Sequence, residues 1–233
     1  MCIKVDNPIE VMSRYEIKYV LNRDETQYIK DSLEGHMQVD RFGKTSIASI
    51  YYDTPDYRLI RASIEKPVFK EKMRLRSYGL ATEDSPVYLE LKRKSQGIVY
   101  KRRIQSTIPE VNHFIKGEEN IEESGQIEKE INYFRNYYRV LKPSCLIIYE
   151  RTAYFEPGGD LRLTIDENPR FRTDDIRLTH DMHGELLLPE GSSILEIKVQ
   201  NSIPLWLSHI LSARNIYQSS FSKYGTAYLK KIA

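Results

Sequence analysis

The chain has 233 residues, 40% of them hydrophobic and 29% charged, which is typical of a soluble globular protein and excludes a largely disordered one. Its 35 Lys and Arg residues nearly balance 33 Asp and Glu, so a site for a polyanion has to come from local clustering of cations. The length is sufficient for one domain with a buried core, and we expect a single domain over residues 1–233 with a loose segment at 1–12.

The sequence gives no sign of a membrane span or an export signal. No run of about 18 apolar residues occurs, and residues 1–11 lack the apolar centre of a signal peptide. We therefore predict a cytoplasmic protein without a membrane span in this chain. Its two cysteines, Cys2 and Cys145, are too few for a disulfide framework or a thiolate metal cluster.

Charged and apolar residues alternate along most of the chain, which predicts β-strands with one charged and one apolar face. In the segment Lys72-Met73-Arg74-Leu75-Arg76, a strand would project three cations from one face and two apolar side chains from the other. Taken alone, such a face is most simply a solvated outer surface. The predicted strands cover, in chain order, residues 14–22, 47–53, 68–78, 87–94, 98–107, 144–154, 160–167 and 194–200.

Apolar residues at helical spacing, together with capping signals, predict α-helices among these strands. Asp24 is expected to cap the first of them. The helices are expected at residues 24–34, 58–64, 127–138, 204–214 and 222–232. A further ribbon is expected at residues 177–188, where His180 and His183 fit a surface turn better than a zinc site because Gly184 marks a hairpin.

The helices need an apolar surface to pack on, and this requirement favours one arrangement of the sheet. In a two-sheet sandwich the apolar faces would meet and leave little for the helices to cover. In a closed barrel with the charges inside, the apolar outer wall is available to the helices and no strand edge is exposed. We therefore predict an α+β fold, a closed antiparallel β-barrel tunnel of about eight strands with a charged interior and α-helices on its outer wall.

The interior of this tunnel would carry many cations. Its lining would comprise Lys18, Lys72, Arg74, Arg76, Lys92, Lys94, Arg103, Arg151, Arg162 and Lys198. So many like charges are unfavourable inside a barrel unless carboxylates and a bound polyanion compensate for them. The carboxylates that would supply part of this compensation are Glu16, Glu90, Asp166 and Glu196. Inward cations and a small net charge argue against nucleic acid as a partner.

Seven short motifs occur in the order RYEIKY, KMRLR, LELK, YERTAY, RLTID, ILEIK and FSKYG. Together they resemble the vacuolar transporter chaperone (VTC) domain, the polyphosphate polymerase branch of the CYTH or triphosphate tunnel metalloenzyme superfamily, from about residue 14 to the C-terminus. The resemblance implies an antiparallel β tunnel that binds a nucleoside triphosphate together with Mn²⁺ or Mg²⁺. It further implies a metal-dependent polymerase that transfers the γ-phosphate of ATP to a growing polyphosphate chain and releases ADP.

The same motifs imply roles for individual residues. Those implied to bind the phosphates during catalysis are Lys18, Arg74, Arg76, Lys92, Arg151, Arg162 and Lys223. Glu196 is implied to hold the metal. Supporting contacts to substrate are expected from Glu16, Lys72, Lys94, Lys101, Arg103, Tyr149, Lys198 and Ser222. The expected partners are ATP and polyphosphate or pyrophosphate, whereas the oligomeric state and a membrane partner stay open.

One departure from the resemblance bears on the reaction. Hydrolytic relatives begin with Glu-x-Glu-x-Lys, whereas this chain has a cation, Arg14, at the first of these positions, before Glu16 and Lys18. A hydrolase must position and deprotonate water, but a terminal phosphate acceptor is already largely ionised, with a second pKa of about 6. We therefore favour a polymerase. The alternatives are a triphosphatase that uses Glu16 and Glu196 as metal ligands, and a non-catalytic module that binds polyphosphate or nucleotides.

Overall fold

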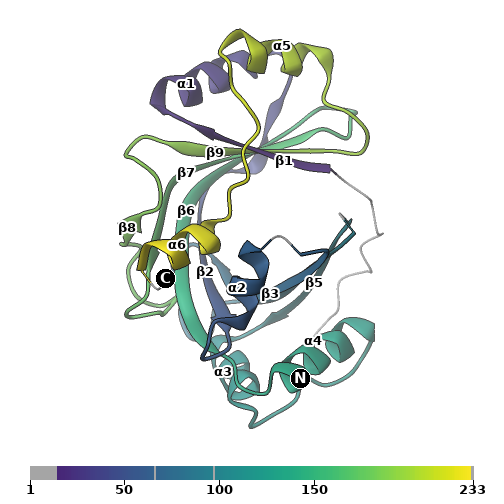
Figure 1. The fold of residues 1–233 in the computed structure, drawn as a ribbon, viewed down its shortest axis with the longest axis vertical. Helices are drawn as coiled ribbons and strands as arrows, with labels where there is room; N and C mark the ends of the chain where they lie inside the picture. The colour runs from purple at the N-terminus through teal and green to yellow at the C-terminus, as the bar shows by residue number, and fades with distance from the viewer. Residues whose placement is uncertain (1–14, 66, 97, 232–233) are drawn as a thin grey trace.

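The computed structural model describes residues 15–65, 67–96 and 98–231, so Arg14 and the segment 1–12 lie outside the described residues. Its strands form one antiparallel sheet in the order β1-β9-β7-β6-β2-β3-β4-β5, and the short strand β8 pairs with β7 (Figure 1). The strands are β1 (Tyr15–Leu21), β2 (Gln38–Asp53), β3 (Phe69–Tyr78), β4 (Val87–Ser95), β5 (Ile98–Ser106), β6 (Lys142–Phe155), β7 (Arg162–Arg172), β8 (Glu185–Leu186) and β9 (Ser193–Val199).

The eight predicted strands and the five predicted helices all form, and one further helix was not predicted. The helices are α1 (Arg23–Ser32), α2 (Arg58–Ile64), α3 (Ile108–Lys116), α4 (Gln126–Tyr138), α5 (Leu205–Ala213) and α6 (Lys223–Lys231). The missed helix is α3, although Thr107 and Glu110 form a capping box at its start and were visible in the sequence. None of the described helices is long and apolar enough to cross a membrane.

Several predicted boundaries were wrong. Asn22, not Asp24, caps α1 through a capping box with Glu25. β2 begins at Gln38 and not at residue 47, because a register shift against β6 interrupts the alternation of its first half. The ribbon predicted at residues 177–188 is reduced to β8, which pairs with β7 over two residues.

The sheet curls but does not close (Figure 1). Its charged face lies on the concave side, where charged side chains of separate elements pair across the curl. β1 and β5 are its edges, and within the described residues no backbone pairing joins them. A side-chain ion pair spans the seam between them, since Glu16 of β1 lies 3.2 Å from Nζ of Lys92 on β4. The prediction of a closed barrel was therefore wrong. Alternation specifies which face turns inward, whereas closure also requires strand tilt and register to match around the sheet.

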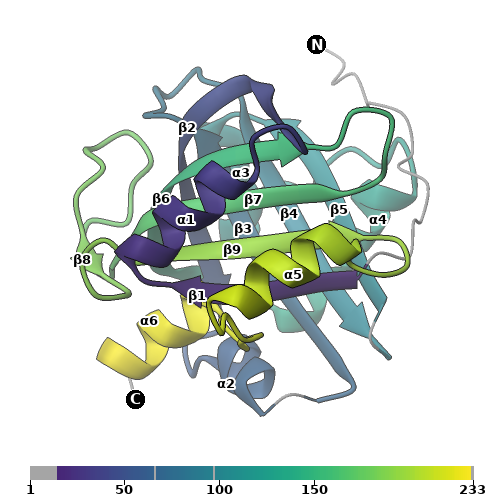
Figure 2. The same cartoon turned by 90° about the horizontal axis from the view of Figure 1, so that it is seen from above.

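Four helices cover the convex, apolar face of the sheet. α3 and α4 pack through Phe114 and Phe134 on the half formed by β2 to β5, where Met73 is fully buried. On the other half, α1 and α5 cross β7, β9 and β1 and pack on them through residues such as Ile29 and Leu207 (Figure 2). The predicted arrangement, with an apolar outer wall under helices and a charged inner face, is confirmed.

α6 lies on the concave side, as expected from the resemblance, which implied that Ser222 and Lys223 contact the substrate. α2 lies at the boundary of the two faces, with Leu59 in the convex core and Ile60 in the concave one, and its placement was not predicted. Ile60 of α2 and Tyr224 of α6 pack against apolar residues of β2 and β6 on the concave side.

Asp53, at the end of β2, is 0% exposed and joins β2 to both helices. It accepts hydrogen bonds from the N–H groups of Leu59 and Ile60 in α2 at 2.9 and 3.0 Å, and from Oη of Tyr224 in α6 at 2.8 Å. This anchoring places the start of α6 inside the curl of the sheet.

Candidate functional site

The concave face gathers more positive than negative charge. Nine Lys and Arg side chains share it with four carboxylates, and we call these 13 residues the inner cationic cluster. The cations are Lys18, Lys72, Arg74, Arg76, Lys92, Lys101, Arg151, Lys198 and Lys223, and the carboxylates are Glu16, Glu90, Asp166 and Glu196. An excess of cations on a partly buried surface is stabilised by a bound anion.

Glu90 of β4 anchors cations of β3 and β5. Its side chain is 1% exposed, and Nε and Nη2 of Arg74 each lie 2.7 Å from its Oε2. Nζ of Lys101 lies 2.6 Å from Oε1, and Nη1 of Arg76 lies 3.9 Å from Oε2. Burial opposes the charge of Glu90, but these cations outweigh it and hold its pKa well below the usual range. Burial also lowers the pKa of Lys101 to about 8, with Glu90 acting in the opposite direction.

Asp166 of β7 is the second anchor and is 0% exposed. Nε and Nη2 of Arg151 donate to its two oxygens at 2.6 and 2.8 Å, and Lys223 at the start of α6 donates to Oδ2. Both cations also make cation–π contacts with the ring of Tyr149. Its centroid lies 5.2 Å from the guanidinium of Arg151 and 4.4 Å from Nζ of Lys223. Burial opposes ionisation of Asp166, but Lys223 and Arg151 lower its pKa.

The third group joins β1 and β9 around two carboxylates. Nζ of Lys18 lies 3.1 Å from Glu16 and 3.6 Å from Glu196, which is its register partner across the two strands. Lys198 lies 2.7 Å from Glu196, and Lys92 lies 3.2 Å from Glu16. Burial opposes the charge of Glu196, but Lys198 and Lys18 hold its pKa well below the usual range. Two hard oxygen donors therefore lie near one another among lysines.

Hydroxyl groups orient the arginines of β3. Arg74 donates from Nη1 to Oη of Tyr51 at 3.0 Å, and Arg76 donates to Oγ of Ser49 at 3.2 Å and to Oη of Tyr149 at 3.1 Å. Burial opposes ionisation of Tyr51, but Arg74 and other cations lower its pKa to about 8. Ser49 and Tyr51 were not among the predicted site residues, although their alternate positions in the strand predicted at 47–53 place them on one face.

Lys72 connects β3 with the segment that leads into α6. Its Nζ donates to Oγ of Ser222 at 3.1 Å. Burial is the main reason that its pKa is lowered to about 8, and repulsion from Lys70, Lys92 and Lys18 adds to this. With a pKa of about 8, Lys72 is still mostly charged at neutral pH, but its surroundings stabilise that charge less than water does.

Three predicted cationic site residues, Lys94, Arg103 and Arg162, lie outside the inner cationic cluster. Arg162 donates to backbone carbonyls at the β6–β7 turn and lies over the ring of Phe155 at 5.7 Å. Lys94 is exposed near the end of β4, and Arg103 is exposed and lies 4.3 Å from the ring centroid of Tyr88. Contact with a phosphate chain stays a prediction for these three residues, as it does for the members of the cluster.

A metal ion would have few protein ligands here. Within the parts of the chain that the structure describes, no group of three or more His, Cys, Asp or Glu residues is placed to hold a metal. His180 and His183 lie in the loop before β8, where each ring contacts a neighbouring aspartate. A hard divalent ion is commonly held by one or two carboxylates, phosphate oxygens and water, which is the donor set that Glu196 and Glu16 fit.

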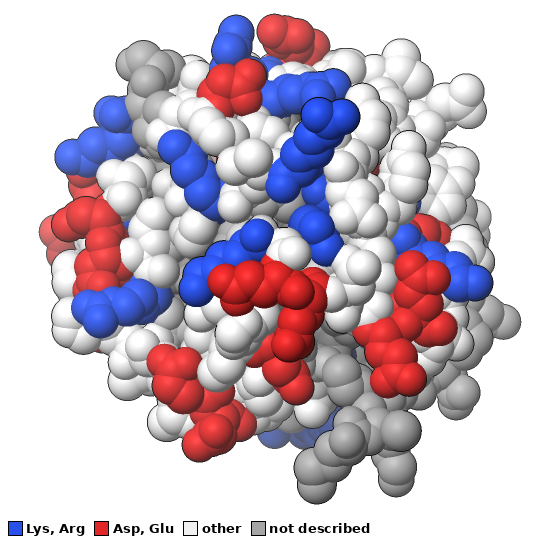
Figure 3. All heavy atoms as spheres, turned by 90° about the horizontal axis from the view of Figure 1, so that it is seen from below, with Lys and Arg blue, Asp and Glu red and all other residues white. Residues whose placement is uncertain are grey.

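The outer surface differs from the concave face. On the side of the molecule drawn in Figure 3, Lys and Arg side chains are interspersed with Asp and Glu. A nucleic acid requires a continuous basic surface, and this face does not provide one.

Comparisons with known proteins agree with the motifs. Residues 13–231 match the model of the VTC domain. Subunit 4 of the vacuolar transporter chaperone complex of Schizosaccharomyces pombe is 24% identical over 223 residues. The match covers 77% of this chain and 31% of that relative, so this chain spans about a third of the relative's length. The fold is similar to a solved "putative adenylate cyclase" from Bacillus halodurans, with a TM-score of 0.57, 12% identity and coverage of 95% of this chain and 100% of that chain. Because the family match spans almost all 233 residues, the protein belongs to the VTC domain family.

Proposed function

We propose that this domain is a metal-dependent polyphosphate polymerase that transfers the γ-phosphate of ATP to a growing polyphosphate chain and releases ADP. The observation that carries the proposal is the excess of cations over carboxylates on the concave face. Phosphoryl transfer depends mainly on positioning and on neutralising the triphosphate, and this arrangement of side chains serves both purposes.

The residues divide this work by their chemistry. Arg74, Arg76 and Arg151 are held by carboxylates and hydroxyls, and their planar guanidinium groups suit two-point contacts to phosphate oxygens. Lysines such as Lys18 act as point charges along the bound polyphosphate chain. Glu196 would hold Mn²⁺ or Mg²⁺, with Glu16 nearby. When bound, the metal neutralises part of the charge on the phosphates.

The described carboxylates favour transfer to phosphate over transfer to water. Glu16, Glu90, Asp166 and Glu196 each contact at least one cation, and their pKa values are all lowered. Such groups are poor bases for activating water, whereas a phosphate acceptor needs no base. Arg14 at the first position of the N-terminal motif points in the same direction.

The second candidate function is a triphosphatase. It is favoured by the proximity of Glu16 and Glu196, which both contact Lys18 and could share a metal and its bound water. It requires one of these carboxylates to give up its lysine and act as a base.

One incubation distinguishes these functions. The purified protein is given ATP and Mn²⁺, and ADP, orthophosphate and polyphosphate are resolved by gel and by phosphorus NMR. Polyphosphate with a matching amount of ADP, abolished by Glu196→Gln and retained by Glu167→Gln, supports the polymerase. Glu167 is a matched control, because it also contacts two lysines, Lys30 and Lys44, but lies outside the inner cationic cluster.

Two other results have clear meanings. Orthophosphate and ADP without a chain would establish the triphosphatase. Binding of tripolyphosphate without any turnover of ATP would leave a binding module.

A further inference from the structure

A cavity of about 870 Å³ lies on the convex side of the sheet, between α2, α4 and the first half of β3. Glu71 and Arg93 line it. Glu71 directly precedes Lys72 in sequence and Arg93 directly follows Lys92, and both lysines belong to the inner cationic cluster. Successive strand residues point to opposite faces, so Glu71 and Arg93 point away from the concave site, while Lys70 also lines the cavity near the start of β3. Its volume falls in the range of sites for small molecules.

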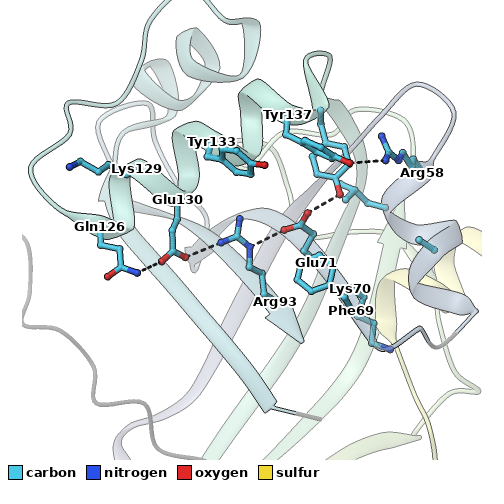
Figure 4. Close-up of a pocket in the computed structure, with 13 residues that line it drawn as sticks. Arg58, Phe69, Lys70, Glu71, Arg93, Gln126, Lys129, Glu130, Tyr133 and Tyr137 are labelled. Carbon is cyan, nitrogen blue, oxygen red and sulfur yellow. Dashed lines mark hydrogen bonds and ion pairs between the residues drawn. The ribbon is translucent and has the colours of Figure 1, made fainter. Parts of the chain in front are cut away.

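The floor of the cavity is a fixed polar network (Figure 4). Arg93 donates to Glu71 at 2.9 Å and to Glu130 at 3.0 Å. Tyr138 donates to Glu71 at 2.8 Å, and Gln126 donates to Glu130 at 2.9 Å. Arg102 also donates to Glu130 at 3.2 Å, so two arginines balance the two carboxylates and the floor gives a ligand an electrically balanced base.

Aromatic rings form the walls and are open to solvent. Tyr133 and Tyr137 project from α4 on one side, and Phe69 of β3 lies on the other (Figure 4). Their exposed fractions are 64%, 51% and 51%. The rings of Tyr133 and Tyr137 are nearly parallel, with centroids 6.1 Å apart. Exposed aromatics gathered in one cavity mark a binding surface more often than a plain solvated one.

A cation is held at one end of these walls. The guanidinium of Arg58 lies 5.4 Å from the ring centroids of both Tyr137 and Tyr138, and Nη2 donates to Oη of Tyr137 at 3.1 Å. That bond uses one of five N–H groups, so others are available to an anion. Lys129 lies at the opposite end of the cavity (Figure 4).

We propose that this cavity is a second ligand site that binds a nucleoside phosphate, with the base against the tyrosines of α4 and the phosphate on Arg58. A simple anion would use only the cation, and an uncharged aromatic ligand would use only the rings. A nucleoside phosphate uses both, and it fits the available volume. The site is independent of the chemistry proposed for the concave face.

The test uses AMP and the metal-free protein, in EDTA, followed by calorimetry and ligand-observed NMR. We expect saturable binding at one site. Tyr133→Ala and Arg58→Ala should each weaken it about fivefold or more, in line with the worth of a stacked base or a phosphate contact. Ribose 5-phosphate, which lacks the base, should bind about fivefold or more weakly than AMP. Tyr217→Ala is the matched control, because Tyr217 is 77% exposed and lies outside the cavity.

Three results would overturn the proposal. The first is failure of AMP to saturate at millimolar concentration. The second is binding of ribose 5-phosphate as tight as that of AMP, which would leave a plain anion site. Loss of AMP binding in Arg74→Ala, with Tyr133→Ala and Arg58→Ala unaffected, would place AMP on the concave face. No step of the test involves turnover, so failure of the polymerase proposal leaves this one standing, and the reverse holds as well.

Discussion

The Glu90→Gln variant removes one negative charge from the inner cationic cluster and keeps the shape of the side chain. Glu90 is 1% exposed, and it lies 2.7 Å from Arg74 and 2.6 Å from Lys101. Removing one partner of a buried ion pair costs about 3–5 kcal/mol of the free energy of unfolding. Lys101, whose pKa is already lowered to about 8, can release its proton and relieve part of the repulsion. We therefore expect a loss near the lower end, about 3 kcal/mol.

The assay is urea unfolding followed by circular dichroism, with and without tripolyphosphate. A ligand that binds only the folded state raises the free energy of unfolding in proportion to the logarithm of its concentration over Kd. The extra positive charge should lower this Kd, so tripolyphosphate should stabilise Glu90→Gln more than the wild type. Glu71→Gln is the matched control: Glu71 is also buried and contacts Arg93 at 2.9 Å, but it lies on the convex face.

Acid adds a second readout of the same variant. The folded-state pKa of Glu90 lies well below its unfolded value of about 4.3, so its stabilisation is complete above that value and is lost as the pH falls. The stability of Glu90→Gln should thus fall less steeply than that of the wild type below about pH 4.3. The reasoning is refuted if the variant loses less than about 1 kcal/mol, or if tripolyphosphate stabilises Glu71→Gln and Glu90→Gln equally.

Three further outcomes follow from the same contacts. Lys72, Lys101 and Tyr51 have pKa values lowered to about 8, so the ligand-free protein should gain stability as the pH rises from about 8 toward 10. Tripolyphosphate binding should weaken over the same range, and unchanged binding at pH 9 would contradict the lowered pKa values of the two lysines. Tyr224→Phe removes the 2.8 Å hydrogen bond to buried Asp53 and should lower the free energy of unfolding by about 1–3 kcal/mol in urea, and an unchanged midpoint would contradict this. Cys145 is buried, and burial raises the pKa of its thiol to about 12. In a Cys2→Ser background it should therefore react with a maleimide only after unfolding, and labelling of the native protein would contradict its burial.

Alternation of charge was the feature of the sequence that predicted most of the site. A strand places every second side chain on one face, so the spacing of Lys72, Arg74 and Arg76 predicted that they lie together. The need of the helices for an apolar surface then predicted which face turns inward. Both predictions depend on local or nearly local sequence patterns, which is why the structure confirms them.

The closure of the sheet and the placement of α6 could not be predicted in this way. Whether β1 meets β5 depends on tilt and register summed over the whole sheet, and no single segment encodes that sum. The position of α6 depends on Asp53 and Asp166, which lie far from it in the sequence. In the sequence, Asp53 read as the end of a strand, with nothing to mark it as the partner of Tyr224.

The internal carboxylates set stability and affinity against each other on the concave face. Without a ligand, Asp166 neutralises Arg151 and Lys223 and so allows them to be buried. The same bonds must loosen or be shared when phosphate oxygens approach these cations. Stronger internal pairing would stabilise the empty domain and weaken its hold on a polyanion, whereas weaker pairing would do the reverse. With four carboxylates for nine cations, the cluster keeps an excess of positive charge that the proposed binding of a phosphate chain would neutralise.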